Sequence, residues 1–120
     1  VSDAMTPVRI ITREQALSAI ECGEFDSDVT ASDRRVAVVM TQDWCPQWAA
    51  MKKWFYSLEI DAGLYELVYN QTDIFNEFRT FKETKWKNGH IPYVRYYHGG
   101  KLAAESNFVS REEFLKNLGL

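Results

Sequence analysis

The spacing of hydrophobic and polar residues changes several times along the chain, and each change predicts a new element. Residues 8–12 are a short β-branched run, which predicts a strand. Residues 13–22 carry apolar positions at helical spacing, between a candidate N-cap at Thr12 and a helix stop at Gly23. Residues 26–33 are polar and acidic and predict a loop. Residues 35–41 are almost continuously apolar, which predicts a strand buried on both faces.

The helical period returns at Pro46, a residue that suits the first turn of a helix, and we expect this helix to end by Gly63. Residues 64–69 predict a strand. A third helix is predicted by the apolar positions within residues 74–81, with Thr72 or Asp73 as its cap. Residues 82–89 are basic and predict a loop in which the lysines are solvated, or else attract an anionic partner such as glutathione.

A hairpin and a final helix complete the pattern. Residues 92–97 and 102–108 are two β-forming runs on either side of Gly99-Gly100, which predicts an antiparallel pair. Ser110 and Glu113 have the spacing of a capping box, which begins a last helix. The order βαβαβα followed by ββα indicates the α/β class, with a central mixed sheet and helices on both faces. We expect one domain over residues 1–120, with residues 1–7 as a loose tail.

Composition narrows the classes of function. The 120 residues are 46% hydrophobic, which is enough for one buried core. The formal net charge is −3, from 17 acidic and 14 basic residues, which argues against a nucleic-acid partner. No apolar stretch approaches the roughly 20 residues that span a bilayer, so no membrane partner is expected. No secretory signal opens the sequence, although Met5 is a candidate native start, and we expect a cytoplasmic protein.

Metal and cofactor binding find little support. The soft metal ligands are two cysteines and two histidines, and no pair of them has ligand spacing. Two cysteines in a domain of this size do not predict a disulfide framework either, and a reducing compartment is the better expectation. We therefore expect no metal and no resident cofactor.

The chemistry of the chain is concentrated in the segment Asp43-Trp44-Cys45-Pro46-Gln47-Trp48, directly after the buried strand. A cysteine at this junction lies at the start of a helix, where free backbone N–H groups and the helix dipole stabilise a thiolate. Asp43 opposes this effect, because a nearby carboxylate disfavours a second negative charge. Cys45 is therefore the candidate nucleophile.

This element order, with Trp44-Cys45-Pro46 after the second strand and the segment Gly89-His90-Ile91-Pro92 before the fourth, resembles the thioredoxin family over nearly the whole chain. The resemblance implies a thioredoxin fold in which Pro92 follows a cis peptide bond and faces Cys45. It also implies that the substrate contacts are made by Trp44, Pro46, Ile91 and Pro92. An extended substrate strand would then pair with the backbone of Ile91.

Three departures from the family pattern change the expected chemistry. Trp48 stands where the second cysteine of a Cys-x-x-Cys pair would be, Val39 stands where many thioredoxins carry a buried acid, and residues 51–54 lack the helix-kinking proline. The usual internal disulfide therefore cannot form. Trp48 also lies on the apolar stripe of its helix, so it is expected in the core, where its bulk restricts access to the sulfur. Trp44 is expected to be partly exposed.

A single reactive thiolate predicts monothiol thiol–disulfide exchange or deglutathionylation, as part of cell redox homeostasis. The expected partner is a protein or peptide thiol or disulfide, or glutathione, which would serve as the external thiol. His90 is a candidate acid for the leaving thiolate, or else a solvated loop histidine. Cys22 is expected to be a small buried hydrophobe away from the site.

Two other functions remain open from the sequence. One is a non-catalytic module that binds a peptide or protein in a groove beside Trp44 and Pro92, with Cys45 incidental. The other is a redox sensor that switches when Cys45 is oxidised to a sulfenic acid. Replacement of Cys45 by serine separates the enzyme from the binding module.

Overall fold

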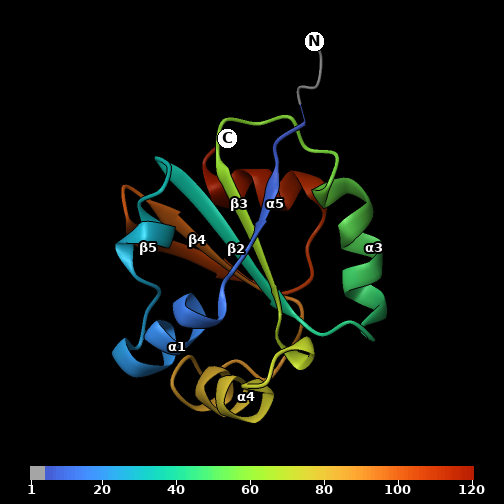
Figure 1. The fold of residues 1–120 in the computed structure, drawn as a ribbon. Helices are drawn as coiled ribbons and strands as arrows, with labels where there is room; N and C mark the ends of the chain where they lie inside the picture. Colours follow the sequence, from blue (N-terminus) through green and yellow to red (C-terminus); the bar gives the residue numbers. More distant parts are fainter. Residues whose placement is uncertain (1–4) are drawn as a thin grey trace.

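The computed structural model describes residues 5–120, in which five strands form one mixed sheet with helices on both faces (Figure 1). The first three strands in the order β1-β3-β2-β4-β5 are parallel, and β4 and β5 add an antiparallel edge. The predicted mixed sheet is confirmed. The strands are β1 (Val8–Ile10), β2 (Arg35–Thr41), β3 (Gly63–Val68), β4 (Tyr93–His98) and β5 (Lys101–Ser106).

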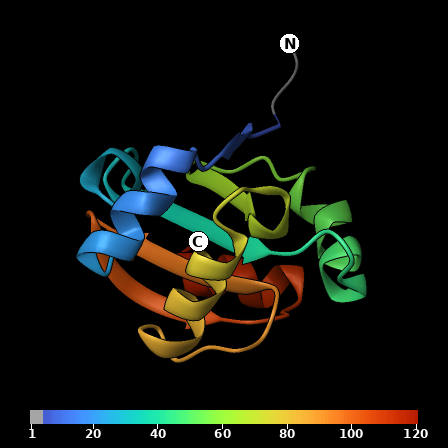
Figure 2. The ribbon, with the colours of Figure 1, turned by 60° about the horizontal axis from the view of Figure 1, so that its bottom comes forward.

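Two pairs of helices cover the sheet. Figure 2 shows α1 and α4 lying side by side on one face, and α3 and α5 lie together on the other. A short helix, α2, follows α1, and one 3-10 turn at Tyr69–Gln71 follows β3. The helices are α1 (Arg13–Cys22), α2 (Ser27–Thr30), α3 (Pro46–Phe55), α4 (Phe75–Thr84) and α5 (Arg111–Leu118).

Local signals in the sequence explain where α1 and α5 begin and end. Thr12 accepts a hydrogen bond from the Gln15 N–H at 3.1 Å, and the Gln15 side chain accepts one from the Thr12 N–H at 2.9 Å. Gly23 ends α1 in the left-handed region at φ 85°, which a residue without Cβ adopts at no steric cost. Ser110 caps α5 by accepting from the Glu113 N–H at 3.1 Å. The predictions at these positions are confirmed.

The second strand lies at the centre of the sheet and is buried on both faces, as predicted. Val36, Val38 and Met40 pack toward α1 and α4, whereas Ala37 and Val39 pack toward α3 and α5. All five side chains are fully buried. Because alternate residues of a strand point to opposite faces, one apolar run supplies both cores.

Several boundaries differ from the prediction. The expected loop at 26–33 contains α2, which Asp26 caps. The cap position of α4 is Ile74 rather than Thr72 or Asp73, and the Asp73 carboxylate pairs with Arg13 at 2.9 Å. This helix continues to Thr84, into the segment expected to be a basic loop, and α3 ends at Phe55, well before residue 63.

Thr6, which lies in the expected tail, is bonded to the rest of the chain. The Thr6 N–H donates to the Leu58 carbonyl at 2.7 Å, and the Thr6 hydroxyl donates to the Ile60 carbonyl at 2.8 Å. Because these bonds tie Thr6 to the chain before β3, Thr6 is part of the folded domain. Residues 1–4 of the expected tail lie outside the described residues.

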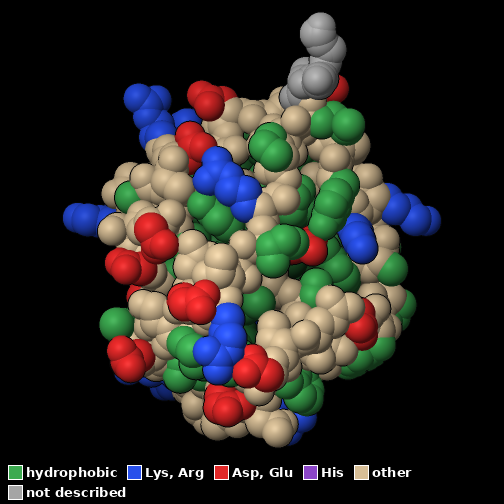
Figure 3. All heavy atoms as spheres, viewed as in Figure 1, with side chains coloured by type: hydrophobic (Ala, Val, Ile, Leu, Met, Phe, Trp, Pro, Cys, Tyr) green, Lys and Arg blue, Asp and Glu red, His purple; other side chains and the backbone are tan. Residues whose placement is uncertain are grey.

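The surface carries both signs of charge. Figure 3 shows acidic and basic side chains scattered over the face seen in Figure 1, without a broad field of either sign. Among residues 5–120, no helix is both long and apolar enough to cross a membrane.

Candidate functional site

Cys45 lies where β2 ends and α3 begins. It is the N-cap residue of α3, with φ −75° and ψ 116°, and its side chain makes no capping hydrogen bond. Pro46 follows at the first helical position and is exposed. The sequence folds this way because proline fits the first turn, where its missing N–H is not needed. The sulfur is therefore placed at the positive end of a helix, as predicted.

The loop before β4 meets this helix start. Because β4 pairs with β2 in the sheet, with Tyr93 opposite Met40, the segment before β4 arrives beside the segment after β2. The Ile91–Pro92 peptide bond is cis. The Cys45 thiol donates a hydrogen bond to the Ile91 carbonyl, with sulfur and oxygen 3.7 Å apart. Among the described residues, the Ile91 N–H has no hydrogen-bond partner.

Two neighbouring tryptophans have opposite surroundings. Trp48 is 3% exposed and packs edge-on against Phe55, with ring centroids 5.7 Å apart. Trp44 is 65% exposed, and its indole N–H donates to the Gln42 side chain at 2.6 Å. Cys45 itself is only 4% exposed. The sulfur is thus nearly covered, while an apolar ring beside it faces solvent, and both tryptophans lie as the sequence predicts.

Asp43 brings a fixed negative charge to the same loop. Its carboxylate accepts hydrogen bonds from the Asn70 amide at 2.8 Å and the Gln71 amide at 3.0 Å. These two bonds lower the pKa of Asp43 from its usual range, and the bond from Asn70 has the larger effect. The Asp43 N–H also donates to Asn70 at 3.0 Å. Asp43 therefore stays charged near neutral pH, two residues before Cys45.

The sequence prediction missed a buried acid next to the site. Glu66 of β3 pairs in register with Val39 of β2, so the carboxylate lies one strand away from the position considered from sequence. It is 8% exposed and accepts a hydrogen bond from the Tyr56 hydroxyl. Burial and this bond raise the pKa of Tyr56. An acid inside the apolar run 64–69 was the available signal.

Glu66 also lines a hollow of about 160 Å³ between α3 and β3. The hollow lies beside the cysteine loop, because Asp43 and Trp48 contribute to its wall. Its remaining lining residues are Ala49, Lys52, Val68 and Gln71. The walls carry both signs of charge, so they indicate no single class of ligand.

The remaining candidate residues lie close to the cysteine but differ in exposure. The His90 side chain is exposed, while its carbonyl accepts from the Lys82 ammonium and its N–H donates to the Asn88 side chain. Ile91 is half-buried and Pro92 is buried. His90 therefore supports the loop through its backbone, and its role as an acid stays a prediction.

The prediction for Cys22 was wrong. Cys22 is exposed at the end of α1, and the buried positions of that helix are Ala16 and Ala19. Cys22 and Cys45 are both free thiols. Within the described part of the chain, no group of three or more Cys, His, Asp or Glu side chains is placed to hold a metal ion.

Comparison with known proteins places the fold. No family model and no curated protein sequence matches the chain. Solved structures do match: a mutant thioredoxin from Halobacterium salinarum has a TM-score of 0.65 at 18% identity, over 98% of this chain and 92% of that one. The chain has a thioredoxin fold.

Two further structures show the same similarity. The short form of thioredoxin f from spinach chloroplast has a TM-score of 0.64 at 16% identity, covering 98% of this chain and 96% of that one. A thioredoxin from Malassezia sympodialis has a TM-score of 0.66 at 10% identity, covering 98% and 92%. The shared fold spans nearly the whole of each chain, and identities this low establish the fold alone.

Proposed function

We propose that the protein carries out monothiol thiol–disulfide exchange, including deglutathionylation, with Cys45 as the nucleophile. The observation that carries the proposal is the position of the Cys45 sulfur, at the start of α3 and 3.7 Å from the Ile91 carbonyl. The helix start favours the thiolate, and the loop beside it has a free backbone N–H for a substrate. The fold shared with thioredoxins supports a redox protein that acts on protein thiols or disulfides.

The reaction balances with one external thiol. The Cys45 thiolate attacks one sulfur of a substrate disulfide, forms a mixed disulfide, and releases the other sulfur as a thiolate that takes up a proton. A second thiolate, from glutathione, then attacks the mixed disulfide and regenerates Cys45. When the substrate is a glutathionylated protein, the products are the free protein thiol and glutathione disulfide. No electron acceptor beyond these disulfides is needed.

Substrate would bind where the loop that carries Cys45 meets the loop that carries Pro92. The unpaired Ile91 N–H can donate a hydrogen bond to a backbone carbonyl of an extended peptide, which would then lie like an added strand. The exposed Trp44 ring offers an apolar contact beside it, and Pro46 forms the exposed start of the helix. These contacts favour a peptide or protein disulfide over a free metal or nucleotide.

The arrangement argues against an internal dithiol cycle. Trp48 occupies the position of a resolving cysteine and is buried against Phe55. Cys22 is exposed at the end of α1, before the start of β2, whereas Cys45 follows the end of β2. The reductant is therefore an external thiol, and the proposed setting is the reducing cytoplasm, where such a thiol is present.

A second candidate is a peptide-binding module without catalysis. The exposed fractions of two neighbouring residues favour it: Cys45 is 4% exposed and Trp44 is 65% exposed. A covered sulfur beside an exposed indole is suited to gripping a partner chain. In that case, replacing Cys45 by serine leaves binding intact, whereas replacing Trp44 by alanine weakens it.

The deciding experiment compares Cys45→Ser with Cys22→Ser after incubation with glutathione disulfide. Intact-mass spectrometry is expected to show one added glutathione in Cys22→Ser and a much slower addition in Cys45→Ser. Turnover of a glutathionylated peptide with excess glutathione is expected to be lost only in Cys45→Ser. Equal turnover in both variants, or none in the wild type, contradicts the proposal.

A further inference from the structure

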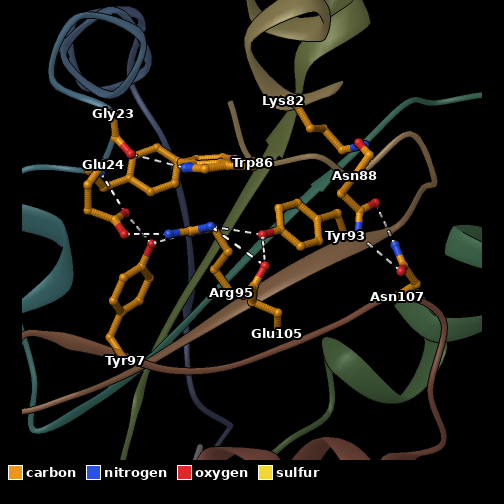
Figure 4. Close-up of polar contacts among 11 residues, drawn as sticks. Gly23, Glu24, Lys82, Trp86, Asn88, Tyr93, Arg95, Tyr97, Glu105 and Asn107 are labelled. Carbon is orange, nitrogen blue, oxygen red and sulfur yellow. Dashed lines mark hydrogen bonds and ion pairs between the residues drawn. The ribbon is translucent and has the colours of Figure 1, made fainter. Parts of the chain in front are cut away.

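A buried lysine lies behind the loop that faces Cys45. Lys82, in the last turn of α4, is fully buried, although the sequence predicts a solvated side chain. Its ammonium donates to the Asn88 carbonyl at 2.7 Å (Figure 4). It also donates to the His90 carbonyl at 2.6 Å. Among the described residues it forms no ion pair with a carboxylate. Its strongest contacts are therefore with the backbone of one loop.

This contact is one residue away from the carbonyl that accepts the thiol of the candidate nucleophile. Lys82 binds the His90 carbonyl, and the next carbonyl, of Ile91, accepts the Cys45 thiol. Ile91 packs against the apolar cluster that includes Cys45. A hydrogen bond from a charged donor is about twice as strong as one between neutral groups, so the ammonium fixes this stretch of backbone firmly.

A second anchor holds the loop from the sheet side. Asn107, after β5, donates to the Asn88 side chain at 3.0 Å and to the Pro92 carbonyl at 3.2 Å. Figure 4 shows Lys82 reaching the loop from α4 and Asn107 reaching it from the opposite side. The loop is thus held between a helix and the end of a strand, and only the anchor on the helix side carries a charge.

We propose that Lys82 is a positioning residue for Cys45, whose ammonium holds residues 88–90 so that Ile91 stays over the sulfur and its N–H stays aligned for a substrate. The inference rests on the proposed function, because it assigns Lys82 a part in how substrate reaches Cys45. The bond to the His90 carbonyl also polarises the His90–Ile91 peptide group, which strengthens the free Ile91 N–H as a donor.

The surroundings of Lys82 make its charge sensitive to pH. Burial lowers the pKa of Lys82 to about 8, and the charge of Glu83 on the same helix only partly offsets this. From β4, the Tyr93 ring faces the ammonium at 5.5 Å. Beyond that ring, Arg95 and Glu105 hydrogen bond to the Tyr93 hydroxyl. Above about pH 8 the anchor becomes neutral and its hold on the loop weakens.

The test measures alkylation of Cys45 by iodoacetamide in three variants. Lys82→Met removes both hydrogen bonds at similar volume, Lys82→Arg keeps the charge, and Lys85→Met is the matched control because Lys85 is exposed at the end of the same helix. We expect Lys82→Met to react at least about fivefold faster than the wild type near neutral pH, since the loss of a charged hydrogen bond frees the loop. Lys82→Arg should restore a slow rate, and Lys85→Met should match the wild type.

The pH dependence distinguishes positioning from simple packing. The ratio of the Lys82→Met rate to the wild-type rate should fall toward one above about pH 8, because the wild type then loses its own charge. If urea titrations show that Lys82→Met is not folded, the wild type is compared with Lys82→Arg. The wild-type rate must then rise relative to that variant above about pH 8, and parallel profiles overturn the inference.

The two proposals fail in different ways. Equal Cys45 rates in the wild type and Lys82→Met, at every pH, overturn the role of Lys82 and leave monothiol exchange untouched. A wild-type Cys45 that forms no mixed disulfide with glutathione disulfide contradicts the proposed function. In that case a faster Lys82→Met still shows that Lys82 holds the loop over the sulfur.

Discussion

Trp48 is predicted to be a structural residue that also covers the sulfur, and replacing it with alanine tests both roles. The side chain is 3% exposed and packs edge-on against Phe55 at 5.7 Å. Removing a buried aromatic ring leaves a cavity and typically costs about 3–5 kcal/mol of stability. The free energy of unfolding should therefore fall by about this amount in Trp48→Ala.

Trp44→Ala is the matched control, because Trp44 is four residues away in the same segment but 65% exposed. Its loss should change the free energy of unfolding by at most about 0.5 kcal/mol, as at other exposed sites. Urea titrations followed by far-UV circular dichroism measure both values without depending on tryptophan fluorescence. Trp48→Phe keeps a ring against Phe55, so its free energy of unfolding should lie between those of the wild type and Trp48→Ala.

Alkylation of Cys45 in the folded variants tests the second role. The rate should rise in Trp48→Ala, because Trp48 and Cys45 belong to the same buried apolar cluster and loss of the ring leaves a cavity in it. A loss of stability below about 1 kcal/mol in Trp48→Ala, or a larger loss in Trp44→Ala, would refute the assignment of Trp48 to the core. An unchanged Cys45 rate in a folded Trp48→Ala would refute its role as a cover.

Three further predictions concern stability and are measured by urea titration. Arg95→Met should lower the free energy of unfolding by about 3 kcal/mol, because the buried guanidinium pairs with Glu24. Arg79→Met is the control: it removes an exposed ion pair and should change the free energy of unfolding by at most about 0.5 kcal/mol. Thr12→Ala removes the cap of α1 and should cost about 1 kcal/mol. Burial lowers the pKa of Lys82 from 10.5 to about 8, so the unfolded chain binds more protons than the folded chain between these pH values. The free energy of unfolding should therefore rise by roughly 2 kcal/mol from about pH 8 to pH 10. Lys82→Met should lack that rise.

The predictable parts of the fold were those that depend on local signals. Thr12, Gly23 and Ser110 mark helix ends through side-chain and backbone chemistry within a few residues. The strand at 35–41 was predicted because an apolar run buried on both faces needs no knowledge of its neighbours. The meeting of Cys45 with the 91–92 loop followed from the resemblance, and the structure attributes it to the pairing of β2 with β4.

The misplaced residues depend on contacts that no local pattern contains. Lys82 lies on the inner side of α4 because the helix runs on to Thr84, and its partners are backbone carbonyls, which every sequence has. Glu66 lies in β3 between two other strands, and its buried carboxylate accepts a hydrogen bond from Tyr56, ten residues earlier. Cys22 is exposed at the last position of α1, and the buried positions of that helix are two alanines.

The most direct test of the central claim is the rate of Cys45 alkylation by iodoacetamide as a function of pH. Mass spectrometry follows Cys45 and Cys22 in the same sample, so the exposed Cys22 serves as an internal control. The proposed function predicts that the alkylation rate of Cys45 at about pH 6 is still a large fraction of the maximal rate that Cys45 reaches at high pH, because a stabilised thiolate persists there. A Cys45 that reacts only above about pH 8.5, or not at all in the folded protein, would contradict it.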